Sequence, residues 1–113
     1  MPTFTAQANS TGQTDAARRL IVLRVTFATP ADDYVLGGYD IDAELPARVG
    51  PGATIRKFSG FAFTTATGAI VGRTLFRQPT NARIIAFDMP DGLETDAGTN
   101  LSAETWQLEF EVD

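Results

Sequence analysis

The sequence predicts an all-β protein, either an antiparallel β-sandwich or a jelly roll of six to eight strands with an extended N-terminal arm. Apolar residues recur at every second position in several segments, which is the period of a pleated strand. Turn-forming Gly, Pro and Asp separate these segments at a spacing of 8–15 residues, as in sandwiches and small barrels. No segment has a helical period over more than one turn. A chain of 113 residues fits one domain, which we place at residues 18–113 behind an arm at residues 1–17.

The arm is mostly small and polar, and Phe4 is its one residue able to anchor it. We therefore expect it to lack core contacts of its own. The first strong strand follows at 19–28, reading RLIVLRVTFA, with every second side chain apolar. A turn is expected at 29–33, because Pro cannot donate to a β-ladder and Asp caps turns.

We predict a second strand at residues 34–42. It contains Gly37 and Gly38, where we expect a bulge or a close backbone approach. A long connection rich in Pro and Gly comes next. The segments 54–63 and 69–77 predict a hairpin around the TTATG loop, with tight packing or bulges at Gly60 and Gly72.

Residues 83–89 predict a short strand, closed by the turn residues PDG. A polar loop then leads to the clearest strand of the chain, which begins at Thr105. Its large apolar side chains fall on one face and its polar side chains on the other. Burying each large apolar side chain is worth roughly 1.5–3 kcal/mol, so we expect the chain to end inside its core. The four apolar residues are Trp106, Leu108, Phe110 and Val112.

Composition argues against most catalytic functions. The chain has no Cys and no His, so it lacks a thiol nucleophile, the commonest general base and the commonest zinc ligand. It contains no nucleophile-elbow, dinucleotide-binding or P-loop motif. We predict a protein that is not an enzyme and needs no cofactor.

Charge and hydropathy limit the classes of partner that the protein can bind. A net charge of −5 disfavours nucleic acid, whose backbone repels an acidic surface. The longest apolar run is far shorter than a membrane span, and the N-terminus shows no basic-then-apolar leader. We therefore expect neither nucleic acid nor membrane as a partner, and assembly in a cytoplasm.

Two ligand-binding hypotheses are weighed and disfavoured. Asp40, Asp42 and Glu44 alternate along one strand face, but such a row is more often a solvated face than a calcium site. An aromatic platform for carbohydrate is also conceivable, although core packing is the favoured role for its members. These aromatic residues are Phe58, Phe61, Phe63, Phe76, Phe87, Trp106 and Phe110.

Charge is distributed unevenly along the chain. Residues 1–83 carry nine basic and six acidic residues, and residues 84–113 carry eight acidic residues and no basic one. Eight of the nine bases are Arg, which is enriched at protein interfaces. Aromatics that no core face explains are also candidates for a contact surface. The candidate interface residues are Phe4, Arg18, Arg19, Tyr39, Arg48, Phe58, Arg73 and Arg77.

Two short motifs resemble a family of small virion proteins of tailed bacteriophages, the head decoration or cement proteins encoded beside the major capsid protein. One motif is Y-x-x-G-G at residues 34–38, after the first apolar strand. The other is G-T-N-L-S-A at residues 98–103, before the last strand, where the family's usual acid is replaced by Asn100. The resemblance covers residues 20–113. Because Asn caps turns as Asp does, the departure matters little if that position only caps a turn.

The resemblance implies a non-enzymatic structural protein that stabilises the phage head by bridging major capsid protein subunits. It also implies a place on the outer head surface and a homo-oligomer, with a trimer preferred over a dimer. The alternatives are a tail, fibre or head–tail joining component, or a carbohydrate-binding β-sandwich module.

Overall fold

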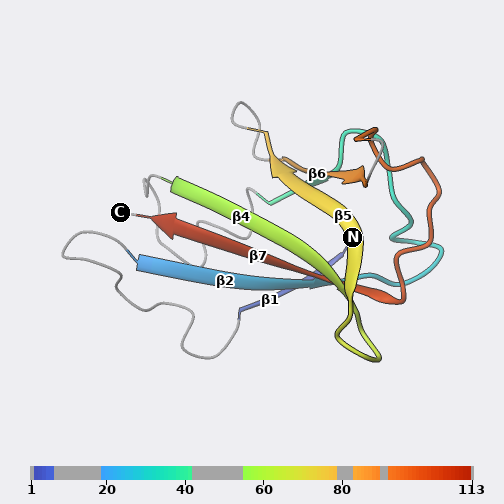
Figure 1. Cartoon of the computed structure of the whole chain (residues 1–113), viewed down its shortest axis with the longest axis horizontal. Coiled ribbons are helices and arrows are strands. Elements are labelled where there is room, and N and C mark those ends of the chain that lie inside the picture. Colours follow the sequence, from blue (N-terminus) through green and yellow to red (C-terminus); the bar gives the residue numbers. More distant parts are fainter. Residues whose placement is uncertain (1, 7–18, 42–54, 79–82, 90–91, 113) are drawn as a thin grey trace.

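The computed structural model describes residues 2–6, 19–41, 55–78, 83–89 and 92–112. These residues form seven strands joined in one curled antiparallel sheet (Figure 1). The strand order is β1-β2-β7-β4-β5-β6-β3. The prediction of an all-β, antiparallel, sandwich-like fold is confirmed. Among the described residues, we find no helix long and apolar enough to cross a membrane.

The centre of the sheet is the terminal strand β7 (Glu104–Val112), which pairs with β2 (Arg19–Thr26) and β4 (Ile55–Thr64). Its alternation is confirmed, because Trp106, Leu108, Phe110 and Val112 are all buried. The side chains of Ile21, Leu23 and Val25 on β2 are buried beside them through the antiparallel register. The two segments with the most completely apolar face in the sequence therefore pair side by side in the core.

The predicted hairpin is also confirmed, as β4 and β5 (Ile70–Arg77) joined by the TTATG loop. Gly60 packs tightly, since a Cβ at this position would lie 3.1 Å from Cβ of Leu75. β6 (Arg83–Asp88) pairs with β5, and β3 (Tyr39–Asp40) pairs with β6.

The predicted strand at 34–42 is wrong over most of its described length. Only Tyr39 and Asp40 are in a strand, because Gly37 and Gly38 have positive φ angles of 89° and 79° and turn the chain. The close backbone approach expected at these glycines is confirmed: a Cβ on Gly38 would lie 2.0 Å from the carbonyl oxygen of Ile84.

The N-terminal arm also needs correction. Residues Thr3–Ala6 form β1, which pairs with β2 in the register Phe4↔Val25. The side chain of Phe4 is buried in the core at 9% exposure, so this part of the arm has the core contacts that the sequence did not predict. Residues 7–17 lie outside the described part of the chain.

An aromatic cluster fills the end of the core beneath β3 and β6. The Trp106 ring lies 4.8 Å from the ring of Phe27 and 5.8 Å from that of Tyr39, both edge-on. Tyr34 contacts Tyr39 at 5.9 Å. Each such pair adds about 0.5–1.5 kcal/mol to the gain from burial. Through Tyr34, this cluster holds the first of the two family-like motifs in the core.

Candidate functional site

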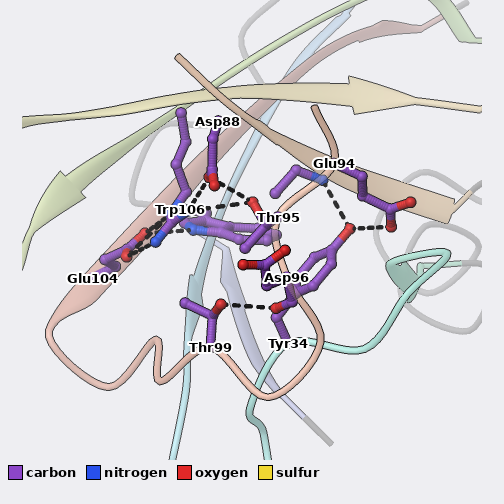
Figure 2. A network of polar contacts seen from close by, with 10 residues as sticks. Tyr34, Asp88, Glu94, Thr95, Asp96, Thr99, Glu104 and Trp106 are labelled. Atoms are coloured by element: carbon purple, nitrogen blue, oxygen red, sulfur yellow. Dashed lines mark hydrogen bonds and ion pairs between the residues drawn. The ribbon is translucent and has the colours of Figure 1, made fainter. Parts of the chain in front are cut away.

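The two motifs that carry the family resemblance meet in space. The backbone N–H of Tyr34 donates to the carbonyl of Thr99 at 2.9 Å, and the N–H of Gly98 donates to the carbonyl of Tyr34 at 2.7 Å. Figure 2 shows Tyr34 and Thr99 side by side at the edge of the polar network. Gly98 has a φ of 84°, which favours glycine at this turn. Segments more than sixty residues apart are thus joined by a reciprocal pair of backbone bonds, which we call the motif clasp.

The tyrosine of the first motif anchors the clasp in the interior. Its hydroxyl donates to Oε2 of Glu94 at 2.7 Å and accepts from the N–H of Ala86 at 3.2 Å. The same carboxylate accepts from the N–H of Gly37 at 2.8 Å. Burial, followed by the neighbouring Glu94 carboxylate, raises the pKa of Tyr34 above its ordinary value. The hydroxyl therefore remains protonated and serves as a structural donor.

The glycines of the first motif are held by Arg83. Its guanidinium donates to the carbonyl of Gly37 at 3.0 Å and to that of Gly38 at 2.7 Å. Because a side chain at Gly38 would collide with β6, the double glycine permits the chain to cross the end of that strand. The Y-x-x-G-G motif thus has a structural explanation in each of its three defined positions.

Asn100 in the second motif caps a turn. Its side chain is exposed, and its Oδ1 accepts from the N–H of Ser102 at 2.9 Å. An aspartate could accept the same bond. An acid at this position would therefore make the same contact.

Arg73, one of the interface candidates, has most of its side chain buried within this chain, and its role at an interface stays a prediction. Its side chain is only 13% exposed, and it bonds to Asp88, Thr95 and Glu104, which are labelled in Figure 2. Nε donates to both oxygens of Glu104, at 2.9 and 3.1 Å, and Nη2 donates to Oε2 at 3.0 Å. Asp88 and Thr95 accept from Nη1. The bonds to Glu104 raise the pKa of Arg73, so the guanidinium stays charged.

The network reaches the core through Glu104, whose side chain is 10% exposed. Its Oε1 accepts from the indole N–H of Trp106 at 3.3 Å. Asp88 is 40% exposed and accepts a further bond from the hydroxyl of Thr95 at 2.9 Å. This arrangement neutralises and orients buried polar groups.

The three aromatic interface candidates also lie in or against the core. Phe4 is buried, and Tyr39 is 7% exposed and donates to the carbonyl of Asp32 at 2.8 Å. Burial raises the pKa of Tyr39 to about 12. Phe58 is half-buried and packs on Phe110 at 5.1 Å. Strand pairing and ring packing turn Phe4 and Tyr39 inward, and their role at a contact surface stays a prediction.

The remaining candidates are only partly placed. Arg77 ends β5 half-buried, and its Nε is buried without a hydrogen-bond partner among the described residues. Arg19 begins β2, and nothing is described of its side chain. Arg18 and Arg48 lie outside the described residues and stay predictions.

Only one of the three alternating acidic residues, Asp40, lies in the described part of the chain. Asp40 lies at the end of β3 and is exposed, whereas Asp42 and Glu44 lie outside the described residues. Within the described ranges, no three acidic side chains come together in a way that would hold a metal ion.

The outward face of β4, β5 and β6 is the feature that the sequence analysis missed. The register Phe61↔Thr74↔Phe87 places alternate residues of the three strands on the face opposite the core. Ile70, Phe76 and Met89 are exposed at 71%, 52% and 56%, and the other members are half-buried. We call this surface the outer apolar face and define it by six residues. They are Phe61, Phe63, Ile70, Phe76, Phe87 and Met89.

The rings on this face pack on one another without entering the core. Phe61 and Phe63 are 5.9 Å apart, Phe76 and Phe87 are 6.4 Å apart, and the guanidinium of Arg24 lies 5.3 Å from the centre of the Phe63 ring. The assignment of these four phenylalanines to the core is wrong. A signal was present in the sequence, because FAF at 61–63 and IIAF at 84–87 are apolar on both faces of their strands.

The outward face of β7 and of the first half of β4 is polar, although Leu20 and Val22 of β2 lie beside it. Beside the outer apolar face, Arg24 donates to Gln107 at 3.2 Å, and Gln107 donates to Glu109 at 2.8 Å. Lys57 and Glu111 continue this polar surface through the register of β4 and β7. The sheet thus presents one charged and one apolar half on the same side.

No family model matches the chain, and searches of curated proteins and of solved structures also gave no match.

Proposed function

We propose that this protein is a non-enzymatic structural component of a tailed-phage virion, of the head decoration type, which stabilises the head by bridging subunits of the major capsid protein. The observation that supports the proposal most strongly is the motif clasp. The two segments that resemble the decoration family form one contiguous unit at the end of the core, held by reciprocal bonds between Tyr34 and the 98–99 backbone. Two motifs that recur together in a family are expected to meet in its fold.

The surface chemistry supports a binding role over a catalytic one. The polar side chains that are brought together around Arg73 satisfy one another, which is typical of a structural network. The outer apolar face offers the kind of area that protein association buries. A protein that joins subunits needs such area and no reactive group.

The decisive experiment combines the purified protein with empty heads assembled from the major capsid protein of the same phage. We expect saturable co-sedimentation at a fixed ratio to the capsid subunit, and heads that withstand higher temperature when saturated. Charge reversal at the two candidates outside the described residues, Arg18→Glu and Arg48→Glu, should weaken binding. Lys57→Glu, at an exposed base that is not a candidate, is the matched control.

Absence of binding to heads would overturn the decoration role. Mass spectrometry of separated heads and tails then tests the alternative tail, fibre or joining role directly. One observation supports the carbohydrate-binding alternative, namely the aromatic rings on the outer apolar face. A glycan array tests this alternative. Phenylalanine provides no hydrogen-bonding group for sugar hydroxyls, so the protein-binding role is favoured.

A further inference from the structure

The outer apolar face is as large as the largest apolar patch on a typical soluble domain, and patches of that size are often binding sites. Three of its side chains are more than half exposed, and three more are half-buried at its centre. Since a large side chain presents about 150–250 Å², the six together expose on the order of 400–500 Å² of apolar surface. One side of a standard protein interface buries about 800 Å², of which a little over half is apolar. The outer apolar face therefore matches the apolar part of one complete interface.

The charge pattern indicates which partner fits. The chain carries a net charge of −5, so two copies that met through their acidic surfaces would repel each other. The outer apolar face contains no charged residue among its six members, and two copies can meet there without burying like charges. The charged half of the same sheet, at Lys57, Glu109 and Glu111, lies outside the contact and remains hydrated.

The geometry of a sheet face suits this contact. Antiparallel sheets pack face to face at a separation of about 10 Å with their side chains interdigitated. A two-fold axis through the centre of the face, near Thr74 on β5, would place β5 of one copy across β5 of the other. Such an interface is isologous and closes after two copies, so it does not propagate into a filament.

From the area, the charge and the geometry, we infer that a second copy of this chain covers the outer apolar face, so that the protein is a two-fold dimer joined through β4, β5 and β6. The inference deepens the proposed function, because a dimer presents two equivalent sets of the remaining surfaces and can join two capsid subunits. It also replaces the trimer that the sequence analysis preferred, since a face-to-face contact around a two-fold axis closes with two copies.

The test begins with the mass of the purified protein in solution, measured by light scattering over a range of concentrations. Wild type should have twice the 12.1 kDa mass of one chain. The variant Phe76→Glu should raise the dimer dissociation constant by at least about 100-fold, because each substitution is present twice in the interface and places a charge against apolar surface. Leu36→Glu is the matched control, since Leu36 is 65% exposed but lies outside the outer apolar face.

Cross-linking provides a second measurement that does not depend on the charged variant folding. The wild-type chain has no cysteine, so a single introduced thiol reports on one position. Thr74→Cys, exposed at the centre of the face, should give a covalent dimer with a short bismaleimide cross-linker, which can span two facing sheets about 10 Å apart. Ala97→Cys, exposed in the loop before the motif clasp, should stay monomeric under the same conditions.

Several outcomes would overturn the inference: a monomeric wild type at 100 µM, a trimer, or a dimer unaffected by Phe76→Glu that cross-links no better through Thr74→Cys than through Ala97→Cys. Failure of the dimer can be told apart from failure of the decoration role. A monomer that binds heads at a fixed ratio refutes the dimer alone. A dimer that depends on Phe76 but ignores heads refutes the decoration role alone.

Discussion

Removing the guanidinium of Arg73 should destabilise the fold by about 3–5 kcal/mol, the range for a buried ion pair that loses one partner. The substitution Arg73→Met keeps most of the side-chain volume but leaves the carboxylate of Glu104 at 10% exposure with Trp106 as its remaining partner in the network. Asp88 is 40% exposed and can recover hydration, so most of the cost arises at Glu104. Such a loss is a large part of the 5–15 kcal/mol by which a typical domain is stable.

Urea unfolding followed by fluorescence measures this loss, because Trp106 is the single tryptophan and lies in the core. In a double-mutant cycle with Glu104→Gln, the combined loss should be smaller than the sum of the single losses by about 0.5–3 kcal/mol. A loss below about 1 kcal/mol for Arg73→Met would refute the reasoning, since that is the range of an exposed pair. If the variant kept full stability and lost partner binding, Arg73 would be the interface residue that the sequence suggested.

The remaining predictions concern the N-terminus, the double glycine and alkaline pH. Phe4→Ala should cost about 3 kcal/mol in urea unfolding, as for a buried aromatic side chain; unchanged stability after deletion of residues 2–6 would restore the interpretation of this segment as a loose arm. Gly38→Ala should prevent folding or lower the melting temperature severely, because its Cβ would lie 2.0 Å from the carbonyl oxygen of Ile84. Gly68→Ala has a similar φ of 74° and open space around it, so it should cost only about 1–2 kcal/mol, and equal losses for the two variants would contradict the steric argument. Burial raises the pKa of Tyr39 to about 12, and burial with Glu94 raises that of Tyr34 as well. Above pH 10 the unfolded chain therefore loses protons that the folded protein keeps, and the stability present below pH 10 should fall as the pH rises, by about 1.4 kcal/mol per unit for each tyrosine. Urea midpoints between pH 8 and 11.5 measure this slope, and Tyr39→Phe should make it shallower.

Period-two patterns predicted the strands well where one face was clearly apolar. β7 agrees with the sequence because its buried and outward side chains differ in polarity from Thr105 onward, and β2 agrees because all its core-facing side chains are apolar. The hairpin of β4 and β5 was predictable from its turn. The segment from Tyr34 to Asp40 was misassigned because its strand-like residues surround two glycines whose positive φ angles break the strand. Local propensity could not show that Gly38 must pass against a strand more than forty residues away.

The site residues were harder to predict, because interface candidates were chosen by residue type. Arginine is common at interfaces, but it is also the side chain best suited to a buried carboxylate, and the partners of Arg73 lie 15 and 31 positions away in the sequence. Phe4 stood alone in a polar segment, and only its pairing with β2 shows that it reaches the core. The motif clasp could be seen only in the fold. The two motifs that it joins were identified in the sequence before their contact was known.

The apolar residues of β4 to β6 link the sequence to the proposed assembly. A strand with one face in water has apolar residues only at alternate positions, as in β7. A strand that is covered on both faces can be apolar at every position. β6 reads IIAF at its centre, and its odd positions face outward while Ile84 and Ala86 fill the core. Exposed aromatic side chains on a sheet raise the risk of non-specific association. A domain that works alone gains no advantage from them. The double-sided pattern is therefore what we expect if these three strands lie at the middle of a larger structure, with a core on one side and a second copy on the other.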